Sequence, residues 1–387
     1  MTLWQPDRRA ALQSLGLLGA SLFIGGRSAR AQAQGAGIFW VNVQASGGWD
    51  QALFCDPKPN LRGPYLDRDL YLYNVPIRDA QGQAARGTAI VRNPSASAVR
   101  STPGGGISYL GFADFQWDPQ DADHPYQPFF PTLYDRITVF NGVDTATNNH
   151  SVGERYSAGG SLNEGMPCFA AQMAGALGAD RPLSFINLGG YDETAGLLAA
   201  TPLRDSLLPN LLAAAGPNDI AGDNQGTDRL LPESALAAVR AAQSQRRARL
   251  VDRLRLPTHQ TALATVEAAG PGLTQLGRLR FRANDQTPEN LLRVGLIASR
   301  EGLAVSMNVI SGGFDSHQDN EQQQIEALYR IFELLKFLIA ESEAPADGSA
   351  PVPVVALVSS DFGRTPHRTE GGTDHWPPSS AMVVQNR

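Results

Sequence analysis

Three apolar stretches of the chain are each followed closely by an aspartate. These aspartates are Asp50, after Gly47-Gly48-Trp49, Asp315, after Gly312-Gly313-Phe314, and Asp361, after Ser359-Ser360. In open α/β sheets, functional groups gather beyond the carboxyl ends of the strands. If the three stretches are parallel strands, their carboxylates meet at one edge of the sheet and begin a site there.

Two imidazoles accompany these carboxylates, His317 two residues after Asp315 and His375 directly after Asp374. Carboxylate and imidazole ligands together are typical of Zn, Mn or Fe sites, whereas Ca and Mg prefer shells of oxygen. The set therefore predicts a divalent metal site, with Zn or Mn favoured over Mg or Ca. Asp315 and His317 are its most specific pair, because alternate residues of an extended segment point the same way. In the alternative interpretation, each aspartate only caps a turn or a helix.

A polar segment over residues 148–160 offers groups for catalysis. His150 is a candidate metal ligand or base, Ser151 a candidate nucleophile and Arg155 a candidate clamp for an anion. The alternative for this segment is a capped loop. Arg364 follows an aspartate in a tight Gly turn and is a candidate to neutralise a bound anion. The full set of candidate metal ligands is Asp50, His150, Asp315, His317, Asp361, Asp374 and His375.

The elements that must position these residues alternate between strands and helices. The expected strands cover residues 37–45, 136–142, 182–188, 303–310 and 352–359, and the expected helices cover 166–177, 232–256, 289–301 and 320–341. This order predicts an α/β fold with a mainly parallel central sheet flanked by helices. Residues 57–131 are rich in Pro, Gly and Asp and predict a loop-rich excursion, and 200–290 predict a partly helical insertion.

The first 33 residues predict a signal peptide of the twin-arginine type. Arg8 and Arg9 precede an uncharged stretch over residues 10–26, and small residues follow at Ala29, Ala31 and Ala33. The apolar stretch is shorter than the ~20 residues of a spanning helix, so we expect it to be cleaved. An ordinary amphipathic first helix is the alternative. The mature chain, residues 34–387, is then one exported domain, periplasmic or otherwise outside the cytoplasm.

Composition disfavours some partners and leaves open whether the two cysteines form a disulfide. The net charge is −6 and the basic residues are scattered, which does not favour nucleic-acid binding. No stretch after the signal is apolar enough to span a bilayer, so we expect no membrane span in the mature chain. Cys55 and Cys168 would enter an oxidising compartment, and both a disulfide and two free buried thiols are compatible with the sequence.

Taken together, the motifs resemble the exported bacterial family called domain of unknown function 1501, which is similar to the alkaline phosphatase and sulfatase superfamily. The resemblance covers essentially the whole chain. It rests on the twin-arginine signal, Gly47-Gly48-Trp49-Asp50, Asp56-Pro57-Lys58-Pro59, Gly313-Phe314-Asp315-Ser316-His317, Ser360-Asp361-Phe362-Gly363-Arg364-Thr365-Pro366 and Asp374-His375-Trp376-Pro377. It implies an alkaline-phosphatase-like fold with long loop excursions. Members of the family usually continue further, so we expect the C-terminus to be shortened.

The resemblance also implies a pair of metals beside a Ser or Thr nucleophile. Carried over by position, Asp315, His317 and His375 would hold one metal. Asp50 and Asp361 would hold the other. The superfamily commonly has a His directly after the Asp of the last strand, and this chain has Phe362 there, so we expect either that His150 substitutes or that the second site is weak or absent.

Two functions follow from this resemblance. The first is a metal-dependent hydrolase of phosphate or sulfate esters, acting on a small anionic substrate. The second is a non-catalytic exported protein that keeps the fold, and with it one metal, and binds an envelope partner. Phe362 and the unassigned nucleophile favour the second.

Overall fold

The structure is a computed structural model of the whole chain. It describes residues 37–57, 72–78, 84–92, 99–110, 126–203, 232–251, 253, 256–257, 259–260, 287–318, 320–369 and 372–386. The chain divides into two units, Met1–Gly35 and Ala36–Arg387. The expected signal peptide, residues 1–33, lies outside the described residues.

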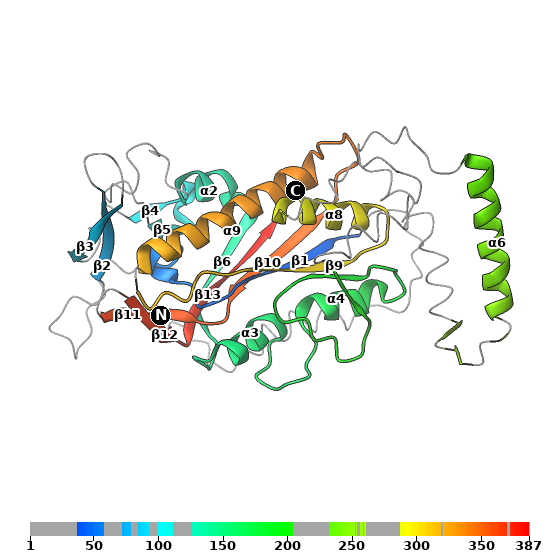
Figure 1. Cartoon of the computed structure of the whole chain (residues 1–387). Coiled ribbons are helices and arrows are strands. Elements are labelled where there is room, and N and C mark those ends of the chain that lie inside the picture. The colour runs from blue at the N-terminus through cyan, green and yellow to red at the C-terminus, as the bar shows by residue number, and fades with distance from the viewer. Residues whose placement is uncertain are drawn as a thin grey trace, which may run out of the picture. The chain divides into compact units, whose positions relative to one another are not determined.

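The centre of Ala36–Arg387 is a seven-stranded mixed sheet (Figure 1). Its strands, in spatial order, are β6 (Ile137–Asp144), β13 (Pro378–Gln385), β10 (Val354–Ser360), β1 (Phe39–Ala45), β9 (Ser306–Ser311), β7 (Phe185–Leu188) and β8 (Ala200–Pro202). Strands β10, β1, β9, β7 and β8 pair in parallel, while β13 is antiparallel to both of its neighbours. The predicted α/β class and mainly parallel sheet are therefore confirmed.

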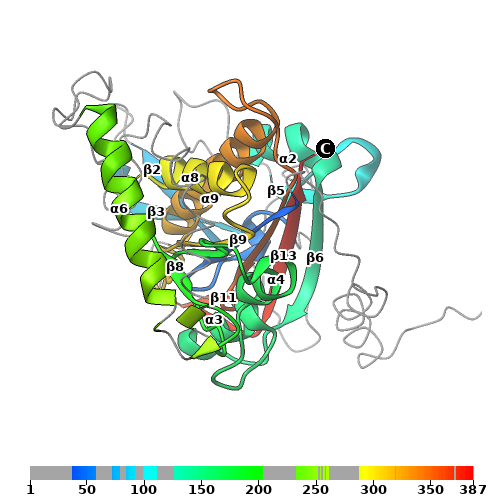
Figure 2. The same cartoon turned by 90° about the vertical axis from the view of Figure 1, so that its right-hand side faces the viewer.

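Helices cover both faces of this sheet, and two views at right angles agree on the layers (Figures 1 and 2). Helices α8 (Pro288–Arg300) and α9 (Asn320–Glu343) lie on one face. Helices α3 (His150–Gly159) and α4 (Phe169–Gly178) lie on the other. Helix α8 begins where the Thr287 side chain accepts a hydrogen bond from the Asn290 N–H, with Pro288 directly after the cap.

The core is largest between the sheet and the pair α8 and α9. Phe39, Val41 and Val43 of β1 are buried in one apolar cluster with Leu292 of α8 and Phe332 of α9. Burying each such side chain stabilises the fold by about 1.5–3 kcal/mol relative to exposure. These contacts fix β1 between β9 and β10, and so fix where the ends of all three strands lie.

The core on the opposite face is smaller and is built against α4. Three alanines of α4, Ala170, Ala171 and Ala174, are fully buried there with Phe185 and Val305. The indole of Trp40 packs edge to face on Phe169, with ring centroids 5.8 Å apart. Alanine has the smallest apolar side chain, so α4 can lie close against the sheet at these positions.

Several elements were not expected from the sequence. Helix α3 occupies a segment for which a capped loop was the alternative to a catalytic stretch. The expected loop-rich excursion contains two antiparallel strand pairs.

The elements outside the main sheet and its covering helices are β2 (Leu72–Arg78), β3 (Ala84–Arg92), β4 (Val99–Ser101), β5 (Ser108–Leu110), β11 (Gly363–Thr369), β12 (Gly372–Trp376), α2 (Tyr126–Leu133), α6 (Glu233–Val251) and the 3-10 turns Gln51–Leu53, Pro103–Gly105 and Tyr134–Arg136.

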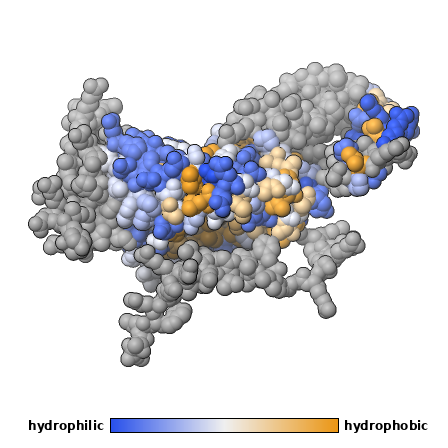
Figure 3. Space-filling model, turned by 90° about the horizontal axis from the view of Figure 1, so that it is seen from below, coloured by the Kyte–Doolittle hydropathy of each residue, from blue (hydrophilic) through white to orange (hydrophobic). Residues whose placement is uncertain are grey.

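The surface that the structure describes mixes polar and apolar residues. Seen from below, hydrophilic residues alternate with groups of hydrophobic ones (Figure 3). Among the described helices, none combines the length and the apolar character that crossing a bilayer requires.

Cys55 and Cys168 are both buried and are not joined by a disulfide. Cys168 stands at the N-cap of α4, where its sulfur accepts a hydrogen bond from the Ala171 N–H, and it is fully buried. Burial raises the pKa of this thiol to about 11, although hydrogen bonds from Ala171 and Asn308 oppose the shift. The thiolate, which is the reactive form, is therefore scarce at neutral pH.

We expect neither thiol to react in the folded protein. Cys55 is as deeply buried as Cys168, so an aromatic disulfide reagent at pH 8 should label none of the native chain within minutes. In denaturant without a reductant, the same reagent should label both cysteines of the chain. Absence of labelling in denaturant would mean that the two form a disulfide.

Candidate metal centre

The candidate residues meet at the edge of the sheet where the parallel strands end. The loops after β1, β9 and β10 carry Asp50, Asp315 and Asp361, and the loop after β6 leads into α3 and His150. Strand β13 runs in the opposite direction, so the segment that enters it, with His375 on β12, arrives at the same edge. The topology therefore explains why residues so far apart in sequence come together.

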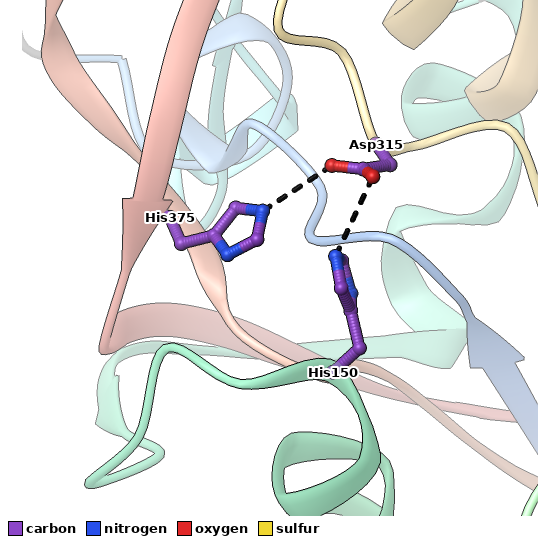
Figure 4. A group of neighbouring side chains, drawn as sticks. All are labelled: His150, Asp315 and His375. Carbon is purple, nitrogen blue, oxygen red and sulfur yellow. Dashed lines mark hydrogen bonds and ion pairs between the residues drawn. The ribbon is translucent and has the colours of Figure 1, made fainter.

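The Asp315 carboxylate is the centre of the cluster, and three imidazoles surround it. Its Oδ1 lies 3.0 Å from Nε2 of His317 and 3.2 Å from Nε2 of His375, and its Oδ2 lies 3.5 Å from Nε2 of His150. The Nε2 atoms of His317 and His375 are 3.1 Å apart. Figure 4 shows His150 and His375 approaching the carboxylate from two different elements, α3 and β12.

Two of the imidazoles are held by acceptors on their outer side. Nδ1 of His375 lies 2.8 Å from the backbone oxygen of Asn148, and Nδ1 of His150 lies 2.7 Å from Oδ2 of Asp361. A carbonyl or carboxylate oxygen can only accept, so Nδ1 carries the proton in both rings. In the neutral form of each ring, the Nε2 lone pair is then directed at Asp315.

The charge of Asp315 is maintained at neutral pH. Burial of its carboxyl works against ionisation, but hydrogen bonds with Arg364 and His375 and the charge of Arg364 outweigh it, and the pKa is lowered to about 2. The side chain is still half exposed. The site therefore presents a permanent carboxylate and imidazole nitrogens to a partly open space.

Arg364 is buried beneath this carboxylate. Its guanidinium donates to Asp315 Oδ1 at 2.7 Å and also to backbone oxygens of the loops that follow β1 and β9 and of β12. These further acceptors are Gly48 (2.8 Å), Phe314 (2.9 Å), Thr373 (3.3 Å) and Gly47. The sequence suggested a group that neutralises a bound anion. In the structure this cation braces the loops and Asp315 instead.

Asp361 and Asp50 lie beside the cluster, and both accept hydrogen bonds from the protein. Oδ1 of Asp361 accepts from the N–H groups of Gly47 (2.9 Å) and Gly48 (2.8 Å), and its Oδ2 faces His150. Asp50 caps the 3-10 turn Gln51–Leu53 by accepting from the Ala52 N–H, and its Oδ2 accepts from Asn320 at 3.0 Å. Neither belongs to the groups of described residues that could hold a metal.

The segment after β6 is a helix because both of its ends are capped. The Asn149 side chain accepts from the Val152 N–H at 3.2 Å, and Gly160 closes the other end with a φ of 70°. Ser151 is exposed in the first turn, next to His150. Arg155 forms an ion pair with Glu164 at 3.0 Å, so the suggested anion clamp already has a partner.

Phe362, which directly follows Asp361, packs against two of the imidazoles. The ring is fully buried, and its centroid lies 4.8 Å from that of His150 and 4.3 Å from that of His375. It therefore forms an apolar wall that restricts both imidazoles. The sequence did not indicate this packing role, nor the role of the Asn148 carbonyl, because backbone acceptors carry no signal in residue type.

Two groups of described residues could hold a metal ion. One is His150, Asp315 and His375, and the other is His317, Asp374 and His375. Asp374 is an exposed residue of β12, and its carboxylate lies near the imidazoles of His317 and His375. Of the seven ligands that the sequence suggested, the structure thus brings five together and gives Asp50 and Asp361 other contacts.

Comparison of the chain with family models, with curated proteins and with solved structures found no match. Function therefore has to be inferred from the chemistry of the site.

The position of His150 depends on a close contact between α3 and the end of β10. A Cβ added at Gly153 would clash with the backbone oxygen of Asp361, which cannot move without displacing the loop. We expect Gly153→Ala to cost about 1–3 kcal/mol in the free energy of unfolding, measured in urea, as overpacking usually does. Gly175→Ala in α4, where the added Cβ would make ordinary contacts at 3.5 Å, is the matched control. Equal stability of the two variants would contradict the close contact.

Proposed function

We propose that this protein is an exported, metal-dependent hydrolase of phosphate or sulfate esters. In this proposal, which rests on the motif resemblance, it is a member of the family called domain of unknown function 1501, with an alkaline-phosphatase-like fold, and its substrate is a small anionic ester. The mainly parallel sheet, with its polar residues beyond the carboxyl ends of the strands, supports the fold. The cluster of Asp and His at that edge supports the metal.

One observation carries the proposal, the two-sided contacts of His150 and His375. Their outer nitrogens are bonded to oxygen acceptors, while their inner nitrogens face Asp315. Metal-binding histidines have this arrangement, because the outer acceptor fixes the tautomer and the orientation of the ring.

The spacing of the inner atoms suits a small divalent ion. Around Zn, with ligands at about 2.0–2.1 Å, neighbouring ligand atoms of a tetrahedral shell lie about 3.3 Å apart. The contacts among Asp315 Oδ1 and Nε2 of His317 and His375 are 3.0, 3.2 and 3.1 Å. Mixed carboxylate and imidazole ligands favour Zn or Mn over Mg or Ca.

Protons are the competing explanation of the same contacts. A doubly protonated His375 could donate to both Asn148 and Asp315 without any metal. Between neutral rings, one proton on Nε2 of His317 can serve its contacts with His375 and Asp315, but it leaves the Nε2 lone pair of His375 facing Asp315 Oδ1 at 3.2 Å, a contact that a shared metal ion would explain.

A bound metal would supply the chemistry of ester hydrolysis by polarising the ester oxygen and lowering the pKa of a bound water towards about 7. The chain contributes the permanent charge of Asp315 and the orientation of the imidazoles. His317, half exposed, lies on the open side where a substrate can enter. Ser151, exposed beside His150, is the candidate nucleophile.

The second candidate function is a non-catalytic exported protein that uses the metal to bind or assemble with an envelope partner. The contacts of the two suggested anion clamps favour it. Arg364 is buried against backbone oxygens, and Arg155 is paired with Glu164. A hydrolase of anionic esters would then have to neutralise its substrate through the metal alone.

We expect the purified protein to retain Zn or Mn and to hydrolyse an aryl phosphate or aryl sulfate. Asp315→Asn and His375→Gln should lower metal affinity by at least about 100-fold, since even outer contacts of metal ligands are worth 10–100-fold. Elemental analysis after desalting measures the metal, and His259→Gln, an exposed histidine on another segment, is the control. A metal-free wild type, or unchanged metal in Asp315→Asn, would refute the metal.

The nucleophile separates the two candidate functions. Ser151→Ala should abolish turnover while leaving the metal content unchanged, because a neutral hydroxyl is not among the usual protein ligands of Zn. This result would exclude the non-catalytic alternative. A wild type that holds metal, cleaves neither ester and captures a stable envelope partner would establish that alternative instead.

We also expect export to depend on the paired arginines. Replacing Arg8 and Arg9 together by lysine should leave the precursor uncleaved in the cytoplasm of a bacterium that has the twin-arginine pathway. Cell fractionation and the mass of the mature chain measure the outcome. Normal processing of the double variant would contradict the assignment.

A further inference from the structure

We infer that this protein binds one divalent ion per chain, and that Asp361 orients the ligand His150 instead of ligating a second ion. This inference rests on the proposed metal site, and it departs from the pair of metals that the family resemblance implies. That resemblance places the second metal on Asp50 and Asp361. Their contacts are those of structural acceptors.

Three donors occupy most of the lone pairs of Asp361. Its Oδ1 accepts from the N–H groups of Gly47 (2.9 Å) and Gly48 (2.8 Å), the Gly47 N–H is shared with Oδ2 at 3.1 Å, and Oδ2 accepts from Nδ1 of His150 at 2.7 Å. An ionised carboxylate offers about four lone-pair sites. Because the side chain is also fully buried, an ion could reach it only by breaking these bonds.

Asp50 is committed in the same way. It is buried, and its oxygens accept from the Ala52 N–H at 3.1 Å and from Asn320 at 3.0 Å. The neighbouring backbone N–H of Asp50 is itself bonded to Gln324. The carboxylate thus begins a turn and anchors it to the first part of α9, which explains its position without a metal.

The space next to Asp361 holds a fixed positive charge and an apolar ring. Asp361 accepts hydrogen bonds from the N–H groups of Gly47 and Gly48, and Arg364 donates to their carbonyl oxygens, so both charged side chains are bonded to the same dipeptide. The guanidinium has no lone pair with which to ligate a metal. Phe362, packed beside it, has no atom that can ligate a metal.

The two metal-holding groups cannot be filled together. Both include His375, whose Nδ1 is bonded to the Asn148 oxygen, so its Nε2 alone can ligate. One imidazole nitrogen binds one ion, so one group at a time is occupied. His317, which lies within 3.1 Å of His375, is then an additional ligand to the same ion or a neighbour of its open position.

Metal titration of the purified, metal-free protein tests the inference. Co²⁺ serves as a coloured probe for the site, with Zn²⁺ checked by native mass spectrometry. We expect the Co²⁺ absorption to saturate at one equivalent and the Zn²⁺-loaded mass to correspond to one ion. Two tightly bound ions per chain would overturn the inference, and none would instead refute the proposed metal function.

Variants of the two aspartates test their assigned roles. Asp361→Asn should still bind one Co²⁺ with the same band positions, at an affinity reduced about 10–100-fold, as expected for an outer partner of a ligating histidine. Asp50→Asn should keep both the spectrum and the affinity. Shifted bands in Asp361→Asn, or loss of an ion in either variant, would make that aspartate a ligand. If Asp361→Asn does not fold, the wild-type stoichiometry and a shifted spectrum in His150→Gln decide the question.

Discussion

The architecture of this edge of the sheet depends on the buried guanidinium of Arg364. A buried charge is costly unless it is paired and fully hydrogen-bonded, and here Asp315 and four backbone oxygens supply the partners. Those oxygens belong to segments on β12 and after β1 and β9. These hydrogen bonds therefore offset the free-energy cost of burying the guanidinium charge, and they also fix the distances between the segments.

Arg364 and Asp361 together explain the Gly47-Gly48 pair. The two residues have φ values of 118° and 81°, which favour glycine, and a Cβ at Gly48 would clash with the Phe362 ring. With both residues in this conformation, the N–H groups point to the carboxylate and the carbonyls point to the guanidinium. The hydrogen bonds of this short glycine turn to two buried side chains of opposite charge thus fix the position of the end of β1.

Ligand geometry is built on this support from outside the parallel strands. His150 comes from α3 and His375 from β12, and each is fixed by an acceptor behind it and by the Phe362 ring beside it. Orientation of imidazoles by outer partners is what gives metal sites their precision. The centre is therefore held by packing and backbone contacts as much as by the residues that face it.

Much of this arrangement could be predicted from the sequence, because strands ending in Asp are visible as apolar runs followed by polar turns. The sheet and the meeting of Asp315, His317 and His375 follow from that pattern. The division of roles does not, since whether Asp361 ligates a metal or accepts backbone hydrogen bonds depends on which N–H groups reach it. Helix α3 was not predicted for a related reason. Its two glycines lower its helix propensity, so the sequence did not indicate that Asn149 caps a helix.

The way in which the site is assembled also bears on the proposed route of export. Its ligands come from α3, from the loop after β9 and from β12, so none of them is preformed in a local segment. A metal site of this kind closes only when the sheet and its Arg364 support have formed, and metal binding is then coupled to folding of the whole domain. A pathway that exports folded proteins would allow the protein to bind its ion in the cytoplasm before export. The proposed twin-arginine signal and the dispersed candidate metal site are thus physically compatible.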